Sequence, residues 1–257
     1  MNKRAPIFLS VVIPTYGRAN SLSETVAALR AFLSAWLLPG RAFEIILVDD
    51  ASPDGTEAVL RTICADMPEA RGLLMSRNCG QQNATLAGLR IARGERVVTM
   101  DDDRKNDLRD IPRLLEVLDA GYDVVYGVPA TSANAADGPR LHRRLGTSIK
   151  ERVLERICHK PPDIRLTSFR AMNRKTVRRA AEETRYRVYL SATLLQAPIL
   201  IGQVPVRETV DAVSASGYHF WKLAVQMWHI AVQYSGHPLA RLLRRRGEPC
   251  PVRETLE

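Results

Sequence analysis

Several widespread motifs are missing from this 257-residue sequence, and their absence excludes some classes of protein. It contains neither GxxxxGK nor GxGxxG, which argues against a P-loop site and against a dinucleotide-binding Rossmann site. The four cysteines form no CxxC pair, so we expect neither a disulfide framework nor a zinc site, and a reducing, cytoplasmic setting is indicated. Aromatic residues make up only 6% of the chain, whereas RNA recognition usually places exposed aromatics among arginines.

Uninterrupted hydrophobic runs of membrane-spanning length are also lacking. Segments 188–206 and 223–240 carry no Asp, Glu, Lys or Arg, but each contains proline, glycine and several other polar residues. We interpret the first as a helix followed by a strand and the second as an amphipathic helix. The amino-terminal stretch MNKRAPIFLSVVIP is broken by Pro14, so it is expected to be a first strand rather than a signal peptide.

Positive charge is in clear excess. The net charge is +9 and the pI is about 9.7, with arginines concentrated at 140–187 and 241–246. This distribution favours an anionic partner for the second half, such as a phosphate, a lipid headgroup or a nucleic acid. A generally basic, solvated surface is the alternative.

Hydrophobic patterning in the first half alternates between strand and helix. Strands are predicted at 7–13, 44–48, 73–76, 97–100 and 123–127, with helices at 21–36, 56–66, 83–93 and 110–120. Strands joined by single helices predict parallel pairing, so the expected fold class is an α/β protein with a mostly parallel sheet flanked by helices.

An acidic triplet ends the predicted strand at 97–100. Asp101, Asp102 and Asp103 follow the apolar run directly, at the sheet edge where α/β proteins bind ligands. Neighbouring carboxylates repel one another by roughly 1 to 4 kcal/mol per pair, and a divalent cation removes that repulsion. Oxygen ligands suit Mg²⁺ or Mn²⁺. A solvated acidic turn that caps the next helix is the alternative.

The loops after the first two predicted strands carry further polar groups. The turn DDASPDGT at 49–56 is rich in hydrogen-bond acceptors. A carboxylate there can accept the ring N–H of uracil or guanine, while Tyr16 offers an apolar face for stacking on a base.

Four segments in this order resemble the family 2 glycosyltransferases of the GT-A fold: VVIPTYGR (11–18), DDASPDGT (49–56), SRNCGQQNATLAGL (76–89) and TMDDD (99–103). The RNxGQ segment, the pair Arg143 and Arg144, and SFRAMNR (168–174) resemble the polyprenyl-phosphate glycosyltransferases of this family. That group includes dolichyl-phosphate mannosyltransferase and undecaprenyl-phosphate aminoarabinose transferase. The resemblance covers residues 7–235, firmly as far as Gly127.

The resemblance implies three sets of site residues. Asp101 and Asp103 would hold Mg²⁺ or Mn²⁺ on the donor diphosphate and, with Arg170, would be the catalytic residues. The nucleotide-sugar would contact Pro14, Tyr16, Arg18, Asp49, Asp50, Arg77, Asp101, Asp102 and Lys105. The acceptor phosphate would contact Arg143, Arg144, Ser168 and Arg170, since the guanidinium fork pairs bidentately with phosphate oxygens. In so basic a chain, a solvated surface position is the alternative for any one arginine.

Two departures from the family pattern concern charge. The family's DxDxQ motif has glutamine where this chain has Lys105, whose ammonium cannot ligate a metal. Lys105 would then contact the diphosphate directly, or metal dependence would be weakened. The window 211–218 lacks the arginine and lysine that relatives carry. No Q-x-x-R-W motif is present, which favours transfer of a single sugar.

From these features we expect an inverting, metal-assisted glycosyltransferase that moves one sugar from a UDP- or GDP-sugar to a polyprenyl phosphate. We expect it at the cytoplasmic face of the inner or plasma membrane, in peripheral contact with anionic lipid and without a nucleic-acid partner. The pattern at 140–158 fits an interfacial helix or a helix packed on the sheet.

Two other functions stay open at this point, as does the oligomeric state. One is a related transferase with a soluble hydroxyl acceptor, and the other is a non-catalytic nucleotide- or RNA-binding module. The expected domain is 1–210, with a nucleotide-sugar half at 7–127 and an acceptor half at 128–210. A helical, basic tail is expected at 211–257, with association with a membrane as one expected role.

Overall fold

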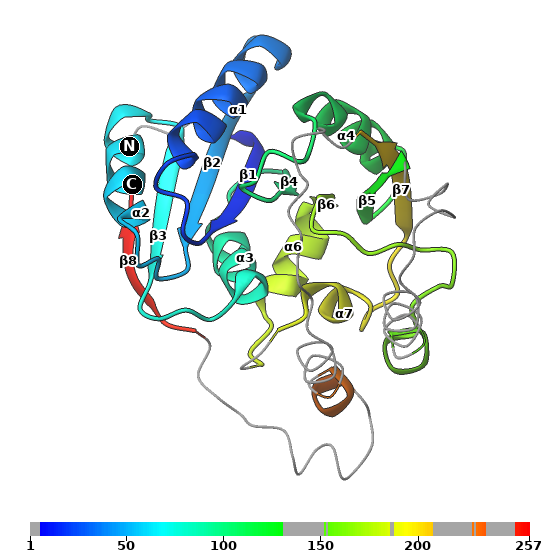
Figure 1. Cartoon of the computed structure of the whole chain (residues 1–257). Coiled ribbons are helices and arrows are strands. Elements are labelled where there is room, and N and C mark those ends of the chain that lie inside the picture. Colours follow the sequence, from blue (N-terminus) through cyan, green and yellow to red (C-terminus); the bar gives the residue numbers. More distant parts are fainter. Residues whose placement is uncertain are drawn as a thin grey trace, which may run out of the picture.

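A single sheet organises the computed structural model, which describes residues 6–130, 152, 154–185, 188–207, 228, 230–234 and 250–257. Its eight described strands follow the order β7-β5-β6-β4-β1-β2-β3-β8 (Figure 1). They are β1 (Ile7–Thr15), β2 (Ala42–Asp49), β3 (Ala70–Met75), β4 (Arg96–Thr99), β5 (Val124–Pro129), β6 (Arg170–Asn173), β7 (Ile201–Val206) and β8 (Val252–Leu256).

Most neighbouring strands are parallel. β1 pairs in parallel with β2 and β4, β2 with β3, and β5 with β7. β6 runs antiparallel between β4 and β5, and β8 runs antiparallel along the edge of β3. The expected mostly parallel α/β sheet is therefore confirmed.

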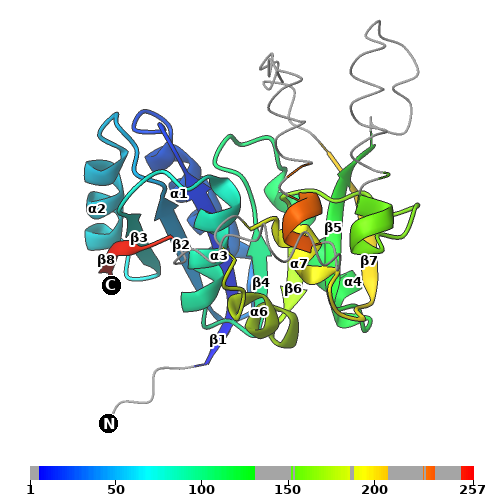
Figure 2. The ribbon, with the colours of Figure 1, turned by 90° about the horizontal axis from the view of Figure 1, so that it is seen from below.

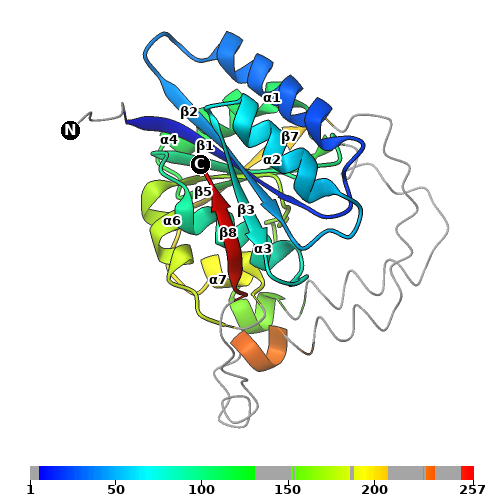
Figure 3. The same ribbon diagram turned by 90° about the vertical axis from the view of Figure 1, so that its left-hand side faces the viewer.

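Helices cover both faces of the sheet. They are α1 (Leu22–Trp36), α2 (Thr56–Asp66), α3 (Gln81–Ile91), α4 (Ile111–Asp119), α6 (Arg174–Ala181) and α7 (Leu190–Leu194), with a short 3₁₀ turn η1 (Leu108–Asp110). Buried side chains of α1, α2 and α4 share one hydrophobic cluster, and those of α3, α6 and α7 share another. Figure 3 shows α1 and α2 on one side of the sheet and α3, α6 and α7 on the other. The strands between them are buried on both faces, which explains their nearly continuous apolar sequence.

The last described strand corrects the expectation of a helical tail. Residues 252–256 form β8, in register with β3, so that Leu256 lies opposite Gly72. This part of the chain therefore belongs to the main sheet, beyond the expected domain limit at residue 210 (Figure 2). Four exposed residues and the partly buried Leu256 show no helical periodicity, and the strand forms by pairing with the edge of β3.

The two uncharged segments 188–206 and 223–240 were not expected to span a membrane. The structure agrees with this interpretation for the residues that it describes. Segment 188–206 contains α7 and then β7, as expected. Residues 230–234 are helical and pack with helix 154–158 through Leu154, Cys158 and Ile230. Among the helices that the structure describes, none has both the length and the apolar character to cross a bilayer.

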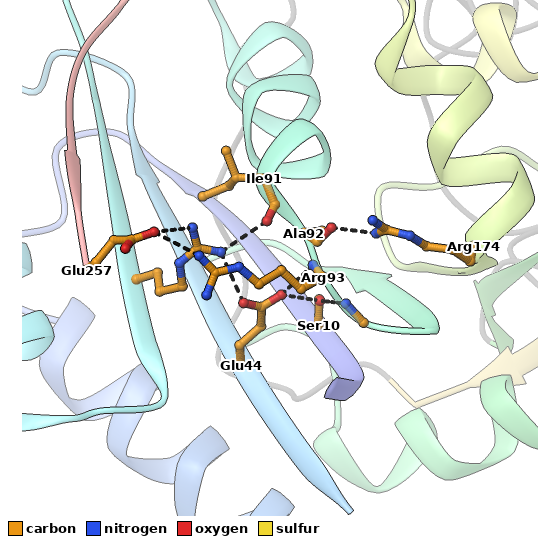
Figure 4. A network of polar contacts seen from close by, with 9 residues as sticks. Ser10, Glu44, Ile91, Ala92, Arg93, Arg174 and Glu257 are labelled. Carbon is orange, nitrogen blue, oxygen red and sulfur yellow. Dashed lines mark hydrogen bonds and ion pairs between the residues drawn. The ribbon is translucent and has the colours of Figure 1, made fainter. Parts of the chain in front are cut away.

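A buried polar network fixes the sheet at the end where β1, β2 and β3 begin (Figure 4). Glu44 in β2 is 3% exposed. Its carboxylate accepts hydrogen bonds from the Ser10 hydroxyl at 2.6 Å, from the Arg93 backbone N–H at 2.6 Å and from the Arg71 guanidinium at 3.2 Å. Three donors satisfy one buried carboxylate and join β1, β2, β3 and the α3–β4 connection.

Glu257 completes this network from the far end of the chain. Its carboxylate accepts from Arg71 at 2.9 Å and from Arg93 at 2.8 Å. Gly94 is required at the same place, because a Cβ there would lie 2.5 Å from the backbone nitrogen of Ser10. The network therefore anchors both the entry into β4 and the end of β8.

We predict that Glu44→Ala lowers the free energy of unfolding by about 3 to 5 kcal/mol. It leaves the buried Arg71 with only the exposed carboxylate of Glu257, and it removes the acceptor of the Ser10 hydroxyl and of the Arg93 N–H. Urea unfolding would measure the change. Glu95→Ala is the matched control, since Glu95 is exposed, pairs with Arg96 at the surface and should change the same free energy by less than about 1 kcal/mol. A similar small effect of both variants would contradict the structural role given to Glu44.

Candidate active site

The acidic triplet lies where the strand order reverses. β1 connects through α1 to β2 on one side, while β4 pairs with the other side of β1. Asp101–Asp103 follow β4 at the carboxyl end of the parallel strands, which is the usual place for ligands in open α/β sheets. The loop after β1 and the loop after β2 meet it there.

The two loops that flank the triplet are tied together by hydrogen bonds from backbone to side chain. Gly17 N–H donates to the Ser52 hydroxyl at 3.0 Å, and Arg18 N–H donates to the Thr56 hydroxyl at 2.8 Å. Ala19 N–H donates to Asp54 at 3.2 Å. This clamp fixes the position of Arg18, whose guanidinium Nε then donates to Asp102 at 3.2 Å.

Asp101 is held from two sides. The Ser168 hydroxyl donates to Oδ2 of Asp101 at 2.6 Å, and the Gln81 side-chain amide donates to Oδ1. The Thr99 hydroxyl in turn donates to the Ser168 carbonyl at 2.6 Å. Gln81 was not among the predicted site residues, although it belongs to the RNxGQ segment that carried part of the resemblance.

The other two aspartates pair with basic side chains. Asp102 accepts from Arg18, as described above. Asp103 lies 2.5 Å from the Lys105 ammonium, and its other oxygen accepts the Lys105 backbone N–H at 3.3 Å. Three predicted nucleotide-sugar contacts, Arg18, Asp102 and Lys105, thus lie close to Asp103, which was predicted to hold the metal.

Burial and mutual repulsion perturb the titration of the cluster. Burial raises the pKa of Asp101, and repulsion by Asp103 and Asp102 adds to it, while the Ser168 hydrogen bond and the Arg170 charge oppose it. Burial likewise raises the pKa of Asp102. The hydrogen bond to Asp103 raises the pKa of Lys105, so this side chain is a cation at neutral pH. A further positive charge nearby would therefore stabilise the ionised forms of Asp101 and Asp102.

Two residues predicted to hold the nucleoside are already engaged within the protein. Asp50 accepts from Cys79 N–H and Gly80 N–H, each at 2.7 Å, and Asp49 accepts from Ser52 N–H at 3.2 Å. Both carboxylates are 2–3% exposed. Their direct structural role is therefore to shape the loops after β2 and β3, and a contact with the base stays a prediction.

The remaining donor-site candidates are spread between core and surface. Pro14 is buried within β1, whereas Tyr16 is 50% exposed just after that strand. Arg77 is exposed in the loop between β3 and α3. The open aromatic face of Tyr16 agrees with the stacking role expected of it, which stays a prediction.

Arg170 lies beneath the site rather than on its surface. It is 1% exposed, donates to the Thr99 hydroxyl at 3.2 Å and to the Ser191 hydroxyl at 2.9 Å, and stands 5.7 Å from the ring centre of Tyr126. This placement disfavours direct contact with an acceptor phosphate. Ser168 faces Asp101, and Arg143 and Arg144 lie outside the described residues.

The fit of a divalent ion can be judged from the donor set. Within the described ranges, no three Asp, Glu, His or Cys side chains converge closely enough to form a complete metal site. Asp101 and Asp103 are near enough for repulsion to raise the pKa of Asp101. Mg²⁺ is commonly bound by one or two carboxylates together with substrate phosphates, so the pair fits an ion shared with a diphosphate.

A disulfide joins the loop after β3 to the segment just before β8. Cys79 and Cys250 are paired, with 6.2 Å between their Cα atoms, although 171 positions separate them in the sequence. The expectation that no disulfide forms is therefore wrong. Its reason is topological, because β8 returns along β3 and brings Cys250 beside the loop that β3 enters. Cys64 and Cys158 are not paired.

Comparison with known families gives one match that covers most of the chain. The model described as "Glycosyl transferase family 2" matches residues 10–181. The undecaprenyl-phosphate 4-deoxy-4-formamido-L-arabinose transferase of Edwardsiella ictaluri is 30% identical over 240 residues, which cover 91% of this chain and 70% of that protein. The transferase of the same name from Pseudomonas aeruginosa PAO1 is 43% identical over 136 residues, 52% of this chain and 39% of that protein.

Solved structures show the same fold at lower identity. The mannosyltransferase PcManGT from Pyrobaculum calidifontis, in complex with GDP-Man and Mn²⁺, matches with a TM-score of 0.58 and 20% identity. The match covers 90% of this chain and 66% of that one. This agreement confirms the expected GT-A-like arrangement of the sheet and its helices.

We predict that Asp101→Asn stabilises the protein at neutral pH. The raised pKa means that the buried carboxylate costs stability above that pKa and costs none below about pH 4, where aspartate is protonated in the unfolded chain too. The asparagine oxygen can still accept from Gln81, and its NH₂ group can donate to the Ser168 hydroxyl in place of the hydrogen bond that Asp101 accepts there. The free energy of unfolding should therefore rise by about 1 kcal/mol near neutral pH.

Urea unfolding at several pH values tests this, with Asp119→Asn as the control because Asp119 is half exposed and pairs with Arg96 at the opposite end of β4. The gain of Asp101→Asn should shrink as the pH falls. A loss of stability at neutral pH would contradict the cost assigned to the buried charge.

Proposed function

Since this chain belongs to glycosyl transferase family 2, we propose that it transfers one sugar from a UDP- or GDP-sugar to a polyprenyl phosphate, with inversion at the anomeric carbon. The single observation that carries the proposal is the carboxylate cluster Asp101–Asp103 at the switch point of the sheet, held by donors from three separate segments: the loop after β1, the start of α3 and the segment before β6. Relatives named undecaprenyl-phosphate transferases, one aligned over 91% of this chain, support the choice of acceptor.

The donor half is built to receive a diphosphate. Asp101 and Asp103 would hold Mg²⁺ or Mn²⁺, which would supply positive charge for the departing nucleoside diphosphate. Arg18 and Lys105 add two further cations at the same edge. The PcManGT structure was obtained with GDP-Man and Mn²⁺, which supports a divalent ion in the proposal but does not choose between Mg²⁺ and Mn²⁺.

The acceptor needs little chemical activation. A phosphate monoester has its second pKa at about 6 and is already an anion near neutral pH. One of its oxygens can attack the anomeric carbon while the bond from that carbon to the donor diphosphate breaks, and the electron pair leaves with the nucleoside diphosphate. A single displacement of this kind inverts the configuration. The task of the protein is then to orient the two anions and to balance their charge.

Residues of the acceptor side take two distinct parts in this proposal. Arg143 and Arg144 would contact the acceptor phosphate. Ser168 would position Asp101 through its 2.6 Å hydrogen bond, and Arg170 would act from below as a fixed buried charge near Asp101. The basic second half of the chain supports peripheral contact with anionic lipid at the cytoplasmic membrane face.

A second candidate is the same transfer to a soluble hydroxyl acceptor. The window 211–218 favours it, because this window lacks the basic residues found in polyprenyl-phosphate transferases. A hydroxyl would need a general base, unlike a phosphate. The solubility of the labelled product separates the two candidates.

We predict that the purified chain moves label from a UDP- or GDP-sugar to undecaprenyl phosphate in detergent, giving an organic-phase product with Mg²⁺ or Mn²⁺ and far less with EDTA. Asp101→Ala should lower the rate at least about 100-fold, since it removes charge stabilisation of the leaving group. Asp119→Ala, which removes an exposed carboxylate at the other end of β4, should keep the rate within about twofold.

An aqueous labelled product in place of the organic-phase product would move the assignment to a soluble acceptor. Full activity of Asp101→Ala would remove the acidic cluster from the mechanism. Full activity in EDTA would remove the divalent ion.

A further inference from the structure

Lys105 supplies the ammonium that pairs with Asp103 of the acidic cluster. Its ammonium lies 2.5 Å from Oδ2 of Asp103, and its own backbone N–H points to the other oxygen. The Lys105 side chain is 35% exposed, and that of Asp103 is 17% exposed. Both side chains of the ion pair are thus partly exposed to solvent.

The other two carboxylates have different kinds of partner. Asp101 is fixed by two neutral donors, Gln81 and Ser168. Asp102 is paired with Arg18, which the clamp between the loops after β1 and β2 holds through its backbone. Lys105 differs because it carries its charge on a flexible four-carbon stem and its ammonium can leave without breaking a backbone contact.

We propose that Lys105 is an internal counter-ion of the donor site: it neutralises Asp103 while no divalent ion is bound, and it turns to the donor diphosphate when one is. This inference rests on the proposed diphosphate site. It adds that the chain itself makes the binding of a divalent ion and of the diphosphate mutually dependent.

The charge balance of the cluster gives the physical reason. Three carboxylates are balanced by three cations, Arg18, Lys105 and the buried Arg170 near Asp101, so the cluster has no net charge. A divalent ion alone would make it net positive and would stand beside a displaced ammonium, which disfavours it. A diphosphate supplies the missing negative charge and gives the ammonium a new partner. Glutamine at this position, as in the family's DxDxQ motif, imposes neither effect.

Two opposite shifts in affinity follow for a neutral side chain at position 105. Without the ammonium, Mn²⁺ alone should bind about tenfold more tightly, since an adjacent unit charge and one ion pair no longer oppose it. In EDTA, UDP or GDP should bind several-fold more weakly, since one cation is lost. A salt bridge with a purely structural role would produce neither shift.

The experiment titrates Mn²⁺ without nucleotide, measured by the electron paramagnetic resonance signal of the free ion, and separately titrates UDP and GDP in EDTA by calorimetry. The variants are Lys105→Met, which keeps the length but not the charge, and Lys105→Arg, which keeps the charge. Lys105→Met should show both shifts, while Lys105→Arg should stay within about threefold of the unaltered protein.

Arg104→Gln is the matched control. It removes one positive charge from the adjacent residue, whose guanidinium is half exposed and pairs with Glu24 at 2.6 Å. It should change the Mn²⁺ affinity by less than about twofold, because solvent and salt screen that charge. An equal tightening in Arg104→Gln, or unchanged Mn²⁺ affinity in Lys105→Met, would overturn the role of Lys105.

These titrations require neither a sugar nor an acceptor. The predicted shifts without any lipid product would support the role of Lys105 and contradict the proposed acceptor. Lipid product with unchanged Mn²⁺ affinity in Lys105→Met would support the proposed function and contradict the role of Lys105.

Discussion

Repulsion among three consecutive carboxylates is the constraint around which this protein is arranged. Asp101–Asp103 follow the carboxyl end of β4, a central strand of the sheet, where burial raises the pKa of Asp101 and of Asp102. Such a cluster is costly unless donors surround it. The chain supplies Arg18 from the loop after β1, Gln81 from the start of α3 and Ser168 from the segment before β6. Hydrogen bonds to Asp101 and Asp102 therefore hold these three segments in place around the triplet.

The polar groups at the two ends of the parallel strands differ in how their charges are satisfied. At the end where β1 and β2 begin, Glu44 is satisfied by donors of the protein alone, and Arg71 and Glu257 close the network. At the other end, Lys105 and Arg18 remain partly exposed beside the carboxylates. The first arrangement favours stability. The second keeps charged groups at the surface, where an anionic ligand can replace one ionic contact with another.

Much of this arrangement could be predicted from the sequence. The apolar runs located the strands β1, β2, β4 and β5 to within a few residues, and the acidic triplet was expected at a strand end because the run stops there. Local patterns of this kind depend only on residues that are close in the sequence. Lys105 was predicted beside the acidic triplet as a contact of the diphosphate, but its ion pair with Asp103 was not predicted.

Partners that are distant in the sequence were not predictable in the same way. Ser168 and Arg170 reach the site because β6 inserts antiparallel between β4 and β5, which no periodicity indicates. The same insertion buries Arg170 under Asp101 instead of exposing it. The pairing of Cys79 with Cys250 depends on β8 returning to the edge of β3. Each of these features depends on how the strands are ordered in the sheet.

The central claim is that the cluster after β4 binds a diphosphate together with a divalent ion. The most direct measurement is a crystal structure with Mn²⁺ and UDP or GDP, in which anomalous scattering locates the manganese. We expect an anomalous peak in direct contact with the carboxylates of Asp101 and Asp103, with diphosphate oxygens completing the coordination of the manganese. A diphosphate bound elsewhere, or manganese bound away from both aspartates, would contradict it.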